Sequence, residues 1–123
     1  MTHLLLIAVG GALGAVARYG VATWLTTSAT RPTLPWGTIA VNLVGCLLIG
    51  ALAGWADTRG TLTESGRLFL MVGILGGFTT FSAFGLESLT LFRSGSVGLA
   101  LLNIALQVGG GLIGVLAGWY IVR

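Results

Sequence analysis

The sequence is that of a small, strongly apolar chain. Of its 123 residues 55% are hydrophobic and only 7% are charged, whereas about a quarter of the residues are charged in ordinary soluble proteins. The formal net charge of +3 comes from six arginines and three acidic residues without a basic run, so nucleic-acid binding is not expected. This composition excludes an ordinary soluble domain and indicates a membrane protein.

Four apolar segments follow one another along the chain. A hydrocarbon core of about 30 Å needs roughly 20 helical residues at a rise of about 1.5 Å each. Short stretches of turn-forming residues separate the segments. We therefore predict one all-α transmembrane domain, residues 1–123, with helices over residues 4–25, 36–56, 68–92 and 97–122.

The first segment, residues 4–25, has one feature of a signal peptide. The small residues "AVA" at 15–17 resemble a cleavage site, but no basic side chain except His3 precedes the segment, and three further spans follow. We therefore expect a retained helix. Arg18 lies within it, where its charge would attract an anion, reach the interface or pair with Glu87.

The second segment, residues 36–56, carries a polar face. Thr38 and Asn42 are four residues apart, so they lie on one side of a helix. Polar side chains at membrane depth need partners, and these two either bond to another helix or line a polar path. Cys46 is the sole cysteine, which excludes an intrachain disulfide, and we expect it to be a small packing residue.

The third segment, residues 68–92, contains the sequence "GGFTTFSAF" at 76–84. Each of the two glycines weakens a helix by ~1 kcal/mol relative to alanine, and the hydroxyls that follow can bond the freed backbone groups. We therefore predict a break in mid-membrane. A break creates two half-helices, of which the carbonyl end suits a cation and the amide end suits an anion.

The second half of this segment carries an aromatic pair and an acid. Phe81 and Phe84 are three residues apart and share a face if the chain is helical there. Phenyl rings have positive edges that can accompany a small anion, although ordinary packing is the alternative. Glu87 lies near the end of the span and is expected to be partly solvated or hydrogen-bonded.

The fourth segment, residues 97–122, repeats the polar spacing of the second. Asn103 and Gln107 are four apart, and Gly111 continues the line. Bonding between helices and lining of a functional site are both open for these amides, because either would satisfy a polar group in the membrane.

Few charges are available to orient the chain. With four spans, three arginines would lie on the face of the two termini and two on the opposite face: Arg59, Arg67 and Arg123 against Arg31 and Arg93. So small a bias permits insertion in both orientations and hence an antiparallel homodimer. The alternative is a single orientation that so few charges do not reveal.

Glycines recur four residues apart, as is typical of closely packed membrane helices. They occur at Gly10 and Gly14, at Gly50 and Gly54, and at Gly110, Gly114 and Gly118. Four short helices leave little interior in which to place polar groups. A pore or polar site is therefore expected between subunits.

Three stretches together resemble a known family. "GGALGAVARY" at 10–19, "WGTIAVNLVG" at 36–45 and "GGFTTFSAF" at 76–84 closely resemble the Fluc (CrcB) fluoride channels in order and spacing. The resemblance implies a dual-topology, antiparallel homodimer in the inner (plasma) membrane, with two pores between its subunits. It also implies that the chain is not an enzyme and lets fluoride leave the cell passively, which lowers fluoride toxicity.

The resemblance also implies roles for individual residues. The ring edges of Phe81 and Phe84 and the Asn42 amide would line the fluoride path, with the hydroxyls of Thr38, Thr80 and Ser82 near it. The backbone carbonyls of Gly76 and Thr79, from both subunits, would hold a structural sodium ion at the dimer centre. Arg18 would lie at the vestibule, with Glu87 one turn beyond the phenylalanines.

The fourth helix departs from some members of the family. Those members have tyrosine and serines where this chain has Asn103, Gln107 and Gly111. The two amides still donate hydrogen bonds and are counted with the fluoride path, whereas Gly111 can donate only through its backbone.

Two alternative functions make different predictions. A proton-coupled exporter of the small multidrug-resistance type needs a deep acid in its first helix, and residues 4–25 contain none. A small assembly subunit held together by glycine faces would show no ion flux. The sequence contains no nucleotide-binding, zinc or catalytic-triad motif, so neither pumping nor enzymatic work is expected.

Overall fold

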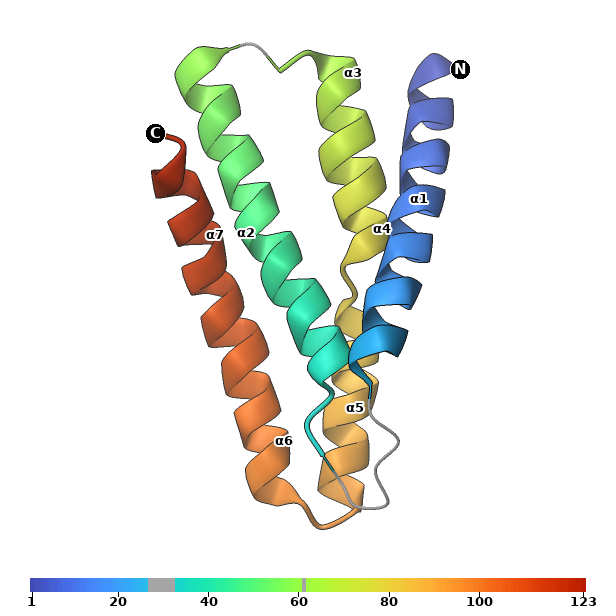
Figure 1. Ribbon diagram of the computed structural model, residues 1–123, viewed down its shortest axis with the longest axis vertical. Coiled ribbons are helices and arrows are strands. Elements are labelled where there is room, and N and C mark those ends of the chain that lie inside the picture. Colours follow the sequence, from blue (N-terminus) through green and yellow to red (C-terminus); the bar gives the residue numbers. More distant parts are fainter. Residues whose placement is uncertain (27–32, 61) are drawn as a thin grey trace.

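The computed structural model describes residues 1–26, 33–60 and 62–123. Within these residues, four helices are long and apolar enough to cross a membrane, as predicted: Thr2–Leu25, Trp36–Arg59, Glu64–Arg93 and Val97–Ile121. Both termini and the connection between the second and third helices lie at one end, and the turn before the fourth helix lies at the other (Figure 1). Arg31, which enters the charge count above, lies outside the described residues.

The first two helices are continuous, whereas the last two consist of several elements. They are α1 (Thr2–Leu25) and α2 (Trp36–Arg59). The third helix comprises α3 (Glu64–Arg67), the π-helix η1 (Leu68–Leu75), α4 (Gly76–Phe78) and α5 (Phe81–Arg93). The fourth comprises α6 (Val97–Ile104), the π-helix η2 (Ala105–Gly109) and α7 (Gly110–Ile121).

Local capping chemistry sets where these helices begin and end. Pro35 precedes the first residue of α2, and Gly60 ends it with a positive φ of 57°, a backbone conformation that glycine adopts readily. The hydroxyl of Thr63 accepts a hydrogen bond from the Gly66 N–H at 3.1 Å and caps α3. Because caps rather than apolar runs end the helices, α2 and the third helix extend past the predicted apolar segments.

Glycines bring α1 against the third helix at backbone distance. A β-carbon on Gly10 would lie 2.7 Å from the Phe69 carbonyl oxygen, and one on Gly77 would lie 3.0 Å from the Cα of Gly11. No side chain fits between backbones at this distance, so only glycine allows the contact. This pair of helices forms one side of the chain (Figure 1).

A second glycine contact joins α2 to α7 on the other side (Figure 1). A β-carbon on Gly54 would lie 2.7 Å from the Trp119 carbonyl oxygen, and one on Gly118 would lie 2.8 Å from the Ala51 nitrogen. The close helix contacts predicted from glycine spacing are therefore present. They lie within one chain, so the glycine pattern does not support the dimer.

The tightest part of the interior is partly polar. Among the described residues, Val41 and Asn103 are the largest side chains with no exposed surface, and Thr38, Ser88 and Gln107 are also buried. By contrast, leucines, isoleucines and valines on all four helices are exposed, as a surface in contact with lipid requires. The buried polar groups lie around the break in the third helix, which positions the candidate site.

Candidate functional site

The third helix is broken at Thr79 and Thr80. Their backbones are extended, with ψ of 158° and 117°, between the helical residues of α4 and α5. The predicted break is therefore present, but the glycines do not form it. Gly76 and Gly77 are helical residues of α4, and Gly77 serves the close contact with α1.

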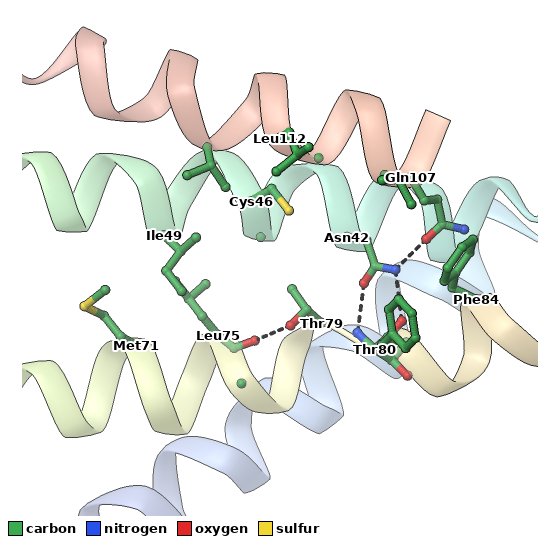
Figure 2. A pocket seen from close by; sticks show the side chains of 16 residues that line it. Asn42, Cys46, Ile49, Met71, Leu75, Thr79, Thr80, Phe84, Gln107 and Leu112 are labelled. Carbon is green, nitrogen blue, oxygen red and sulfur yellow. Dashed lines mark hydrogen bonds between the residues drawn. The ribbon is translucent and has the colours of Figure 1, made fainter. Parts of the chain in front are cut away.

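The side chain of Asn42 replaces the hydrogen bonds lost at the break. Its Oδ1 accepts from the Thr80 N–H at 2.8 Å, and its Nδ2 donates to the Thr80 carbonyl at 3.0 Å. Figure 2 shows Asn42 reaching from α2 to this residue. An unpaired backbone group in the membrane costs several kcal/mol, so this amide makes the break tolerable at that depth.

The hydroxyl of Thr80 caps the second half-helix. Its Oγ1 accepts from the Ala83 N–H at 3.3 Å, and it lies 3.3 Å from the Ser82 hydroxyl. This is the usual N-cap arrangement, in which the cap satisfies one of the first free N–H groups of the helix. The N–H groups of Phe81 and Ser82, at the positive end of α5, have no helical acceptor.

The break also removes the helical donors of several carbonyls, among them those of Gly76 and Thr79. In a continuous helix the Gly76 carbonyl would accept from Thr80 and the Thr79 carbonyl from Ala83. Here the Thr80 N–H donates to Asn42 instead, and the Ala83 N–H donates to the Thr80 hydroxyl. Gly76 and Thr79 therefore both present a carbonyl oxygen without its helical partner.

A chain of side-chain amides extends from Asn42 into the fourth helix. The Asn42 Nδ2 donates to Gln107 Oε1 at 2.6 Å, and the Gln107 Nε2 donates to Asn103 Oδ1 at 2.9 Å. Asn103 Nδ2 then donates to the Ser88 hydroxyl at 2.9 Å. The polar faces predicted on the second and fourth helices thus meet, and hydrogen bonds between helices join them.

The acid on α5 bonds to α2 rather than to an arginine. The Thr38 hydroxyl donates to Glu87 Oε1 at 2.6 Å, and among the described residues the buried Oε2 has no hydrogen-bond partner. The Arg18–Glu87 pair considered above is therefore absent from the described part of the chain. Arg18 is half-buried on α1, and Glu87 borders a pocket of about 230 Å³ beside Trp36 and Thr38.

The two phenylalanines form an edge-to-face pair with different exposure. Their ring centroids are 5.2 Å apart and the ring planes meet at 64°. Phe84 is 8% exposed, whereas Phe81 is 79% exposed. Phe84 therefore belongs to the interior, and Phe81 projects from the surface of the single chain.

Both phenylalanines border an open groove of about 470 Å³ along the face of the chain. Asn42, Thr80 and Gln107 lie at one end of it, and Ile49 and Met71 lie toward the other (Figure 2). The groove thus joins the polar break to a long apolar wall. Cys46 is part of that wall, beside Gly111, as expected for a small packing residue.

Sequence reasoning missed Ser88 and the length of the groove. Ser88 is buried, and its hydroxyl donates to the Phe84 carbonyl at 2.8 Å. The only signal for it is its place one residue after Glu87 on a helix face that also holds Phe84. Within the described residues, no group of three or more His, Cys, Asp or Glu side chains could hold a metal ion.

Comparison with known proteins gives matches over nearly the whole chain. Residues 5–119 match the family model described as CrcB-like protein, Camphor Resistance (CrcB). A relative from Novosphingobium aromaticivorans is 48% identical over 100% of this chain and 98% of its own length. Relatives from Rhizobium etli (45% identical, 100% and 98% covered) and Chloroflexus aurantiacus (47%, 96% and 93%) are similar. All three are named fluoride-specific ion channel FluC.

Proposed function

We propose that this chain, which belongs to the CrcB family, is a fluoride-selective ion channel that passively exports fluoride from the cytoplasm. The family match confirms the resemblance carried by "GGFTTFSAF". The observation that carries the function is the break at Thr79 and Thr80, with Asn42 beside it and the phenylalanine pair at the start of α5.

The chemistry at the break suits a small, strongly hydrated anion. Such an ion must exchange its water for closely spaced donors, and it must be held weakly enough to leave. Phe81 and Ser82 offer N–H groups at the positive end of α5, and Thr80 and Ser82 offer hydroxyls. The proposed path also includes Thr38, Asn42, Phe84, Asn103 and Gln107.

Each group on this path can contact fluoride without trapping it. An amide, a hydroxyl and the edge of a phenyl ring carry partial positive charge, whereas a buried cation would bind the ion tightly. Arg18 lies on α1 and is assigned to the vestibule, with Glu87 beyond the phenylalanines. There a cation raises the local concentration of anions without holding them in the path.

A second copy of the chain completes this path in the proposal. Phe81 is 79% exposed and the groove beside it is open, so one chain provides only one wall. An antiparallel homodimer of dual topology would cover the groove and create two pores between its subunits. The near balance of arginines at the two ends supports insertion in both orientations.

The residues around the break fit a structural sodium ion at the dimer centre. Hard cations prefer oxygen ligands, and unwound backbone carbonyls bind sodium in other membrane proteins. Gly76 and Thr79 each present a carbonyl oxygen that has lost its helical donor. When bound, the cation would contribute positive charge and cross-link the two copies; both carbonyls would hold it.

The proposal places the protein in the inner (plasma) membrane as a multi-pass, non-enzymatic channel. Its four apolar helices support membrane insertion, and its relatives are named ion channels. A small multidrug-resistance-type exporter is not favoured, because α1 contains no acidic residue.

Fluoride efflux from liposomes tests the function. Purified protein is reconstituted into vesicles loaded with potassium fluoride, and a potassium ionophore balances the charge while a fluoride electrode records release. We expect rapid fluoride release, no comparable release of chloride, and loss of flux on changing Asn42, Phe81 or Phe84. A wild-type protein that releases no fluoride, or three variants with normal flux, would contradict the proposal.

A further inference from the structure

Both hydrogen-bond donors of the Asn42 amide are occupied. One Nδ2 hydrogen is donated to the Thr80 carbonyl at 3.0 Å, and the other is donated to Gln107 Oε1 at 2.6 Å. An asparagine side chain has no third N–H. An anion therefore receives a hydrogen bond from Asn42 only if one of these two acceptors is released.

Backbone groups at its two ends fix the orientation of the whole amide chain. The Thr80 N–H can only donate, so it must face Asn42 Oδ1, and Nδ2 then faces Gln107 Oε1. At the other end the Ser88 hydroxyl donates to a backbone carbonyl, which can only accept. Because neither end can reverse, Gln107 must present an oxygen and not a nitrogen to Asn42.

The two acceptors that bond to the Asn42 amide differ in how easily they can be displaced. The Thr80 carbonyl belongs to the backbone of the break, and Thr80 is held there by a second bond, which its N–H donates to Oδ1 of the same asparagine. Gln107 contributes a side chain with several rotatable bonds, and it lines the groove beside Asn42 (Figure 2). The oxygen of Gln107 is thus the acceptor that an arriving anion can displace.

Asn103 holds the Gln107 side chain beside Asn42. Asn103 has no exposed surface, and its Oδ1 accepts from Gln107 Nε2 at 2.9 Å. Gln107 also lies in the π-helix η2, and short π-helical segments frequently mark functional sites. When the anion leaves, the tethered oxygen can return to Asn42, so the amide is not left unpaired in the membrane.

We propose that Gln107 is a positioning residue that competes with the permeating fluoride for one N–H of Asn42. This inference rests on the proposed function and explains why the path binds fluoride weakly at Asn42. Fluoride must replace an existing hydrogen bond at Asn42, which lowers its net affinity there. A lower affinity favours release, as conduction requires.

Removing the competing oxygen tests the proposal. In Gln107→Met the side chain keeps its length but loses the strong acceptor, and in Gln107→Asn the shorter amide withdraws the acceptor while the site stays polar. The rate of fluoride efflux is measured over a range of fluoride concentrations. We expect the half-saturating concentration to fall about fivefold, the factor that corresponds to ~1 kcal/mol for one hydrogen bond, with a lower maximal rate.

A control and a second variant separate competition from loss of structure. Thr90→Val changes an exposed hydroxyl that, among the described residues, bonds to a carbonyl of its own helix, and both kinetic quantities should stay at the wild-type value. The Gln107→Asn variant gives the same readout if the methionine variant does not fold.

The outcomes distinguish this inference from the proposed function. Wild-type protein without fluoride efflux would overturn the channel assignment itself. A conducting wild type whose Gln107 variants lose maximal rate at an unchanged or higher half-saturating concentration would overturn only the competition.

Discussion

Phe81 and Phe84 show how two identical residues can have different roles. They contact each other at 5.2 Å between ring centroids, yet Phe84 is 8% exposed and Phe81 is 79% exposed. Truncation of a buried phenylalanine leaves a cavity and lowers the free energy of unfolding. Loss of a phenylalanine that is exposed on the single chain leaves no cavity inside that chain, so its effect on flux is less mixed with a loss of stability.

Phe81→Leu is therefore the cleaner test of the aromatic path. We expect fluoride efflux to fall by about tenfold, the factor that corresponds to ~1.4 kcal/mol from one lost ring-edge contact, with a smaller fall in melting temperature than Phe84→Leu causes. Phe92→Leu is the matched control, because Phe92 is an exposed phenylalanine on the same helix outside the groove. Equal flux in the two variants would remove Phe81 from the path.

At the scale of the elements, glycines determine how closely α1 approaches the third helix. The contact at Gly77 joins two backbones. The cost of adding a β-carbon there can be compared with the cost at a glycine where a β-carbon would meet no described atom. Gly85 lies on α5 of the same helix, and a β-carbon there would meet no atom of the described residues within 4 Å. The two positions form a matched pair.

Gly77→Ala is expected to destabilise the protein and Gly85→Ala is not. A β-carbon on Gly77 would lie 3.0 Å from the Cα of Gly11, and overpacking of this kind costs about 1–3 kcal/mol. At Gly85 alanine favours the helix by up to ~1 kcal/mol. Thermal unfolding in detergent measures both, and a Gly77→Ala protein as stable as wild type would contradict the close contact.

The break shows what the sequence could and could not predict. Its existence followed from "GGFTTFSAF", because glycines and hydroxyls in an apolar span weaken a helix. Its position at Thr80 depends on Asn42, which is 38 residues away and satisfies the backbone there. A contact between distant residues leaves no local signal, so the stretch predicted a break without identifying the residues that form it.

The polar faces could be predicted because they depend on spacing within one helix and not on contacts between distant residues. Asn103 and Gln107 are four residues apart on one helix, so their shared face follows from helical geometry alone. That they bond to Asn42 and Ser88 depends on how the second, third and fourth helices pack together. Ser88 was missed because a single serine on an apolar helix commonly bonds only to its own backbone.

At the scale of the whole molecule, sodium binding predicts a change in stability. A ligand that binds only the folded dimer raises its free energy of unfolding with concentration, by about 2.7 kcal/mol at 100 times the dissociation constant. We expect the melting temperature in detergent to rise when sodium replaces a large organic cation such as N-methylglucamine. A melting temperature that does not respond to sodium would contradict the assignment of Gly76 and Thr79.

The orientation of the chain is the remaining property of the whole molecule, and introduced cysteines can measure it. Ser94 lies in the turn after α5 and Ser65 lies in α3, at opposite ends of the third helix. In a Cys46→Ala background, Ser94→Cys and Ser65→Cys each provide a single thiol for a membrane-impermeant maleimide.

Dual topology predicts the same labelling at both ends. Because the arginine bias is small, about half of the copies should react from outside sealed vesicles at either position, and all should react after solubilisation. A single orientation would instead give full labelling at one position and none at the other. That result would exclude the antiparallel dimer, and with it the second copy that closes the groove beside Phe81.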